Sequence, residues 1–124
     1  MFKQQCSALT ATGDTTKTLI DTFTVPDGCS AIVGVASQVC GSATLTTGES
    51  TTGLLELESD DAPVTPAAFL TDVITILTSG AVSLKPTQWP CDIKVKAGNR
   101  IKAYVTMDMA QTGALKARVQ LTYA

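Results

Sequence analysis

Apolar and polar residues alternate with a period of two along much of this chain. Leu55 and Leu57, for example, alternate with Glu56 and Glu58. This is the pattern of a β-strand with one face buried and the other in water. Turn-forming residues separate such segments about every ten positions, which is typical of a β-sandwich or barrel. The pattern therefore predicts an all-β domain.

Two segments in the first third of the chain extend this pattern. In 16–25, we expect Leu19, Phe23 and Val25 to share one face of a strand. Residues 30–40 are apolar at both odd and even positions. Such a run predicts a central strand buried on both sides.

The last forty residues alternate most regularly. The apolar residues fall on odd positions: Ile93, Val95, Ile101, Ala103, Val105, Leu115, Ala117, Val119, Leu121 and Tyr123. The basic residues fall on even positions: Lys94, Lys96, Arg100, Lys102, Lys116 and Arg118. Ala97-Gly98-Asn99 predicts a three-residue hairpin connection between two paired strands. We therefore expect Lys94, Lys96, Arg100 and Lys102 to form one exposed basic ridge.

One segment departs from the strand pattern. Thr65 suits a helix N-cap and Pro66 the first helical position, which predicts a short helix or turn near 66–71. The β-branched run that follows, Val73–Ile76, predicts a strand. No linker or internal repeat interrupts the chain, so residues 1–124 are expected to form a single domain.

Composition narrows the class of protein. The net charge is −2 and only 16% of residues are charged, which makes nucleic acid an unexpected partner. The longest apolar stretch, Ala31–Ala36, is far shorter than the ~20 residues that span a bilayer, so no membrane insertion is expected. The first residues also lack the apolar segment of a secretory signal.

The chain is poor in catalytic and metal-binding groups. It has no histidine, which removes the commonest general base and metal ligand. Glu58, Asp60 and Asp61 do not have the spacing of an EF-hand, and a solvated loop is the simpler interpretation. Trp89 suits either a sugar-stacking platform or a loop aromatic folded over the end of the domain. We therefore expect no enzyme activity, no metal site and no cofactor.

Four cysteines leave the redox state open. Cys6, Cys29, Cys40 and Cys91 show no C-x-x-C spacing, which argues against a zinc site. The plain interpretation is four buried thiols, which behave as small hydrophobic side chains. The alternative is one or two disulfides; if all four cysteines pair, three pairings are possible.

Charge is divided unevenly along the chain. Residues 1–84 carry two basic and nine acidic side chains, a net charge of −7, whereas 85–124 carry seven basic and two acidic, a net charge of +5. These charges either face water or set the register between subunits. In the second case the candidate interface residues are Lys94, Lys96, Arg100, Lys102, Glu56 and Glu58.

Two motifs carry a resemblance to a known family. Thr22–Gly28, followed by a buried strand, and Asp92–Ile101, with its Ala-Gly-polar turn, resemble segments of small viral jelly-roll proteins. These proteins include capsid and head-decoration proteins. The resemblance covers about a third of the chain and implies an antiparallel β-sandwich of jelly-roll type.

The resemblance implies a structural role in a virion. The chain is then expected to assemble with copies of itself, as a trimer or pentamer, and with other capsid proteins. Assembly is expected in the host cytoplasm. The alternatives are a carbohydrate- or receptor-binding module, which uses loops at one end of the sandwich, and a subunit of a cellular surface filament.

Overall fold

The computed structural model describes residues 2–11, 16–43, 50–51, 53–59, 67–70, 74–75, 80–83, 87–107 and 115–124. These residues form twelve strands: β1 (Lys3–Cys6), β2 (Thr10–Ala11), β3 (Thr18–Thr24), β4 (Ala31–Ala43), β5 (Ser50–Thr51), β6 (Gly53–Ser59), β7 (Ala67–Leu70), β8 (Ile74–Thr75), β9 (Gly80–Ser83), β10 (Thr87–Lys94), β11 (Arg100–Met107) and β12 (Leu115–Tyr123).

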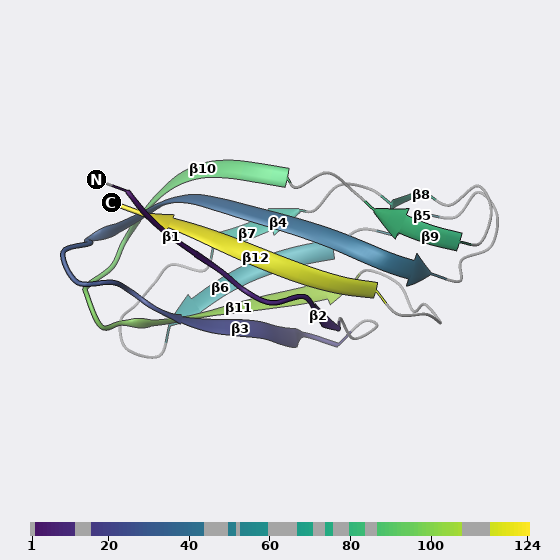
Figure 1. The fold of residues 1–124 in the computed structure, drawn as a ribbon, viewed down its shortest axis with the longest axis horizontal. Coiled ribbons are helices and arrows are strands. Elements are labelled where there is room, and N and C mark those ends of the chain that lie inside the picture. The colour runs from purple at the N-terminus through teal and green to yellow at the C-terminus, as the bar shows by residue number, and fades with distance from the viewer. Residues whose placement is uncertain are drawn as a thin grey trace.

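Two antiparallel sheets pack face to face as a sandwich (Figure 1). The first sheet has the order β1-β12-β4-β10, and we call it the β4 sheet; β2 also pairs with β12, and β9 with β4. The second has the order β3-β11-β6-β7, and we call it the β11 sheet. The short strands β5 and β8 pair with each other. The all-β sandwich predicted from the alternation is confirmed.

The strand pairs are nested. β1 pairs with β12, β3 with β11, β4 with β10, and β6 with β7, so the chain runs as one long hairpin wrapped around the core. β2 follows β1 along the same edge of β12, and β9 precedes β10 along the same edge of β4. This nested order is that of a jelly roll, as expected from the sequence.

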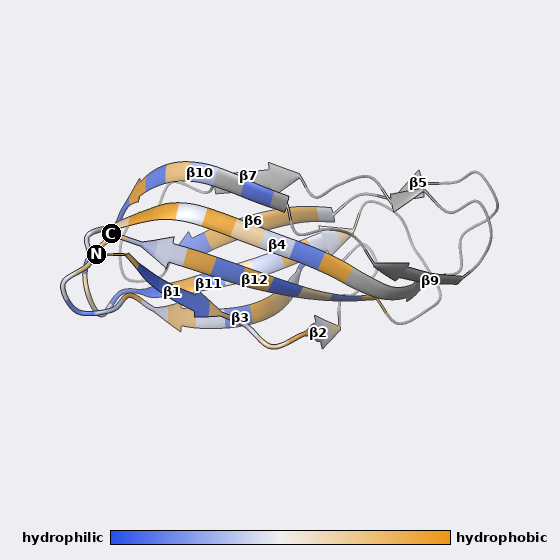
Figure 2. Cartoon of the chain, turned by 45° about the horizontal axis from the view of Figure 1, so that its top comes forward, coloured by the Kyte–Doolittle hydropathy of each residue, from blue (hydrophilic) through white to orange (hydrophobic). Residues whose placement is uncertain are grey.

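The core lies between the two sheets. Along β12 and β11 the odd positions are buried and the even positions are exposed or half-buried, as the alternation predicts. Leu55 and Leu57 of β6 have no exposed surface, which confirms their inward orientation. Alternating hydrophobic and hydrophilic bands are visible along β12 and β4 in Figure 2. Side chains from the two inner faces interdigitate to form this core.

A β-bulge changes the face assignment in β3. The register between β11 and β3 shifts between Ala103 and Tyr104, where an extra residue, Ile20, enters β3. As a result Ile20 is 6% exposed and packs in the core, whereas Leu19 is 44% exposed. Phe23 is buried as predicted, but the prediction that Leu19 shares its face is wrong, because a bulge reverses the alternation.

Two other expectations also need correction. The helix expected near 66–71 is a strand over Ala67–Leu70, because these residues pair with β6, and this long-range pairing overrides the local capping signal. Residues 66 and 71 lie outside the described residues. β4 is central in its sheet, as predicted, but Gly34, Ala36 and Gln38 on its outer face are only half-buried. The prediction of burial on both sides is therefore wrong.

The predicted hairpin at Ala97-Gly98-Asn99 is a crossing between the sheets. β10 pairs with β4, whereas β11 pairs with β3 and β6. The turn lies beside the crossing from β3 to β4, since Gly98 N donates to Val25 O (2.9 Å) and Val25 N donates to Asn99 O (2.9 Å). The two motifs that carried the resemblance are thus hydrogen-bonded neighbours at the end of the sandwich where both termini lie (Figure 1).

Gly98 is required at this corner. Its φ is +87°, a conformation that costs other residues about 1–2 kcal/mol. Gly98→Ala should therefore lower the free energy of unfolding by about 1 kcal/mol in urea denaturation. Gly34→Ala is the matched control, because its added Cβ would meet Thr122 Cβ at an ordinary 3.5 Å. Equal effects of the two substitutions would contradict the corner geometry.

Side chains from β1 and β2 close one side of the sandwich. Gln5 Nε2 donates to Thr24 O (2.9 Å), and Thr10 Oγ1 donates to Ile20 O (3.3 Å). Gln5 also accepts a hydrogen bond from the Tyr123 hydroxyl (2.8 Å). The edge of the β4 sheet is thereby tied to β3 at the edge of the β11 sheet, which covers β3 carbonyls that would otherwise be open to pairing.

Tyr123 makes stability depend on pH in the alkaline range. Burial, with a smaller effect of Cys29, raises the pKa of Tyr123 well above its usual value of 10.0. Between pH 10 and the raised folded-state pKa, the unfolded chain releases the phenolic proton and the folded chain keeps it, so stability falls as pH rises. At pH 11 the loss relative to pH 8 should be about 1.4 kcal/mol larger in the wild type than in Tyr123→Phe, as measured by urea denaturation. Equal losses in the two proteins would show that Tyr123 titrates normally.

Candidate functional site

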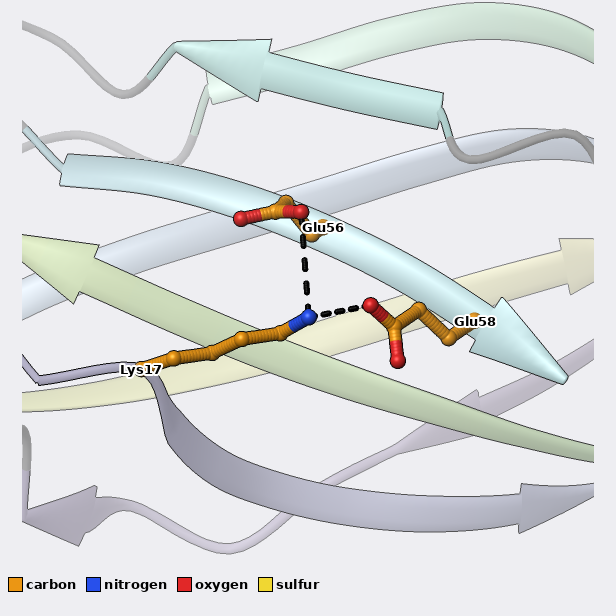
Figure 3. A network of polar contacts seen from close by, with 3 residues as sticks. All are labelled: Lys17, Glu56 and Glu58. Carbon is orange, nitrogen blue, oxygen red and sulfur yellow. Dashed lines mark hydrogen bonds and ion pairs between the residues drawn. The ribbon is translucent and has the colours of Figure 1, made fainter.

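Lys17 organises a charged cluster on the outer face of the β11 sheet (Figure 3). Its side chain reaches across β11 to two carboxylates of β6. The ammonium is hydrogen-bonded to Glu58 and lies 3.9 Å from Glu56 Oε2. It also lies 4.6 Å from the centroid of the Tyr104 ring, a cation–π distance. We call Lys17, Glu56, Glu58 and Tyr104 the Lys17 cluster.

The two acids proposed as interface residues therefore face cations of their own chain. Lys102 is directly opposite Glu58 in the register of β11 and β6, and Tyr104 is opposite Glu56. The hydrogen bond to Glu58 raises the pKa of Lys17, against an opposing effect of partial desolvation. Since these groups are partly exposed, their pairing adds little stability. Their role in a subunit interface stays a prediction.

The four basic residues of the expected ridge do not form one face. Lys94 ends β10 in the β4 sheet, whereas Arg100 and Lys102 belong to β11 in the other sheet. Lys96 lies in the corner between them, where its backbone N donates to Asn99 Oδ1 (2.8 Å). Lys94 Nζ lies 3.1 Å from Asp92 Oδ1, and both side chains are largely exposed. The prediction of a single ridge is wrong, because β10 and β11 lie in different sheets and do not pair.

A shallow groove crosses the outer face of the β4 sheet. Gly34 and Ala36 of β4 form its floor, opposite Thr122 and Gln120 of β12 in the register. Gln88 and Pro90 of β10 flank β4 on its other side, again opposite Ala36 and Gly34. The hollow has a volume of about 380 Å³ and is lined by Gln4, Gly34, Val35, Ala36, Gln88, Pro90, Gln120 and Thr122. We call it the amide groove.

The amide groove continues into a second hollow along β4. This hollow has a volume of about 200 Å³ and shares Ala36 and Gln120 with the first. Its other lining residues are Cys6, Ser37, Gln38 and Arg118. Among the described residues that line the two hollows, Arg118 is the charged one.

Some polar side chains of the two hollows have no hydrogen-bond partner among the described residues. Gln4 Nε2 makes a long hydrogen bond of 3.4 Å to Thr122 Oγ1. The side chains of Gln88, Gln120 and Arg118 make no hydrogen bond or ion pair within the part of the chain that the structure describes. Their donors and acceptors are therefore available to a molecule that enters the groove.

Three cysteines are free thiols in different environments. Cys29 is buried, Cys6 is exposed, and Cys91 is half-buried with its Sγ 3.4 Å from Ile32 O. The expectation that all thiols are buried is therefore wrong for Cys6. Burial, with a smaller effect of Asp92, raises the pKa of the Cys91 thiol and lowers its reactivity. The Cys40 side chain lies outside the described residues.

Three further groups noted in the sequence lie outside the described part of the structure. Asp60, Asp61 and the Trp89 side chain are not among the described groups. Within the described ranges, no three histidine, cysteine, aspartate or glutamate side chains gather in a way that suits a metal ion. In the part of the chain that the structure describes, no helix has the length and apolar character needed to cross a membrane.

Sequence reasoning missed the groove and the role of Lys17. The apolar run over 30–40 predicts burial of Gly34 and Ala36, whereas two small residues at alternate positions of a strand also suit a hollow. In the sequence, Lys17 contributes only to the charge balance. Its partners lie about forty positions further on, and no local pattern connects them.

Comparison with known proteins adds no identification. The chain matches no known protein family, and no curated protein is significantly similar to it.

Proposed function

We propose that this chain is a structural protein of a virion, which self-assembles into a capsid shell or decorates and stabilises one. The observation that carries the proposal is the nested jelly-roll order of the strands, an architecture common among viral capsid domains. In this role the chain is not an enzyme and needs no cofactor. Its partners are copies of itself, as a trimer or pentamer, and other capsid proteins.

The corner at one end of the sandwich supports the same proposal. The two motifs that resemble viral jelly-roll proteins are far apart in the sequence, yet they meet through hydrogen bonds between Val25, Gly98 and Asn99. Their shared position gives the resemblance a common structural basis, because both motifs carry the chain from one sheet to the other. Assembly would take place in the host cytoplasm, and the assembled protein would be located in the virion.

Gene context and particle composition test this proposal. We expect genes for a terminase or a portal protein beside the gene of this chain. We also expect mass spectrometry to detect the chain in virus particles purified on a density gradient from the source material. Neighbouring genes of cellular metabolism, together with absence from the particles, would contradict a virion role.

A further inference from the structure

The amide groove has a floor of small residues between longer polar side chains. Gly34 and Ala36 on the central strand leave the hollow open, because neither side chain extends beyond a methyl group. Gln88 belongs to β10 and Gln120 to β12, the two strands that pair with β4 on either side. The hollow over β4 is therefore flanked by two primary amides, one on each side.

The lining suits a ligand rich in hydroxyl groups. A glutamine amide offers two donors and an acceptor, so it can bind two neighbouring hydroxyls at once. Neither the Gln88 nor the Gln120 side-chain amide has a hydrogen-bond partner among the described residues. Pro90 and Ala36 add small apolar surfaces against which the C–H face of a sugar ring can pack. The described lining residues of this hollow are uncharged, which matches the neutral part of such a ligand.

Arg118 adds a requirement for negative charge at one end. It lies on β12 two residues before Gln120, and both face outward from the sheet. Its guanidinium has no partner within the described residues, so it is free to bind a carboxylate or a sulfate in bidentate geometry.

We propose that the amide groove, together with the second hollow that continues it, binds a saccharide that carries an anionic group, with its hydroxyls on Gln88 and Gln120 and its anion on Arg118. This binding role goes beyond the structural role proposed above and does not depend on it. A second copy of the chain is a poorer occupant, because stable protein interfaces bury large apolar side chains. Among the described lining residues of the groove, the largest aliphatic one, Val35, is only 2% exposed.

Isothermal titration calorimetry on the full chain tests the proposal with three hexasaccharide probes. Hyaluronan supplies carboxylates, chondroitin sulfate supplies sulfates as well, and chitohexaose is a neutral oligosaccharide that shares N-acetylglucosamine with hyaluronan. We expect at least one of the two acidic probes to bind more tightly than chitohexaose. The comparison between the acidic probes identifies whether carboxylate or sulfate is preferred.

Two substitutions locate the site. Arg118→Gln should weaken the acidic probe about tenfold or more and leave chitohexaose unchanged. Lys116→Gln is the matched control, because it removes the same charge from the same strand and face, outside the groove. Lys116→Gln should change the affinity for the acidic probe very little. The double change Gln88→Ala and Gln120→Ala should weaken every probe that binds.

Four results would overturn the proposal. The first is that no probe binds at millimolar concentration. The second is that Lys116→Gln weakens binding as much as Arg118→Gln, which would indicate unspecific attraction to a basic face. The third is that chitohexaose binds as tightly as the acidic probes. The fourth is that Arg118→Gln changes the oligomer size in sedimentation velocity, which would place another copy in the groove.

Discussion

Replacement of Tyr123 by alanine should lower the free energy of unfolding by about 3–5 kcal/mol, in the range found for buried aromatic residues. Tyr123 has no exposed surface and packs in the core. Its hydroxyl donates to Gln5, which in turn donates to Thr24 O, so the substitution also breaks the link between the edges of the two sheets. Urea denaturation followed by circular dichroism measures the loss.

Two variants separate the contributions at this position. Tyr123→Phe keeps the ring and removes only the hydroxyl, and we expect it to cost about 1 kcal/mol. Thr122→Ala, at the neighbouring outward position of β12, should change stability by less than about 0.5 kcal/mol. If Thr122→Ala were as costly as Tyr123→Ala, the register of β12 would be wrong.

Substitution by alanine should destabilise the protein at one of two buried serines, Ser7, and not at the other, Ser37. Ser7 Oγ accepts a hydrogen bond from Val119 N (2.9 Å) and donates to Ala8 O (3.0 Å). Ser7→Ala leaves the Val119 N–H without an acceptor in a buried place, which should cost about 1–3 kcal/mol.

Ser37 is the matched counterpart. It is 4% exposed, and its Oγ has no hydrogen-bond partner in the described part of the chain. Ser37→Ala should therefore leave the free energy of unfolding unchanged or raise it, because it removes a buried hydroxyl that gains no hydrogen bond on folding. The same urea titrations compare the two variants. A larger loss at Ser37 than at Ser7 would contradict both assignments.

Regular alternation made β11 and β12 predictable. In both strands every second residue is buried, and no bulge interrupts the inward positions from Ile101 to Met107 or from Leu115 to Leu121. The same rule failed in β3, where a single inserted residue exchanges the faces of Leu19 and Ile20. This bulge leaves no clear mark in the sequence, because Leu19 and Ile20 are both apolar.

Long-range pairing accounts for the other failures. Ala97-Gly98-Asn99 specifies a tight turn with a positive φ at glycine, but a tight turn can join two strands of one sheet or two sheets. Thr65-Pro66 is a local helix signal, which the pairing of Ala67–Leu70 with β6 overrides. The pairing of β11 with both β3 and β6 places Lys17 beside Glu56 and Glu58. Contacts of this kind depend on topology, which local patterns do not contain.

The mass of the protein in solution tests the central claim most directly. A shell or decoration protein of this type should form a closed homo-oligomer, and light scattering at micromolar concentration should give a trimer or pentamer of the 12.9 kDa chain. Under the same conditions, a stable species of 12.9 kDa would contradict the proposed role in capsid assembly.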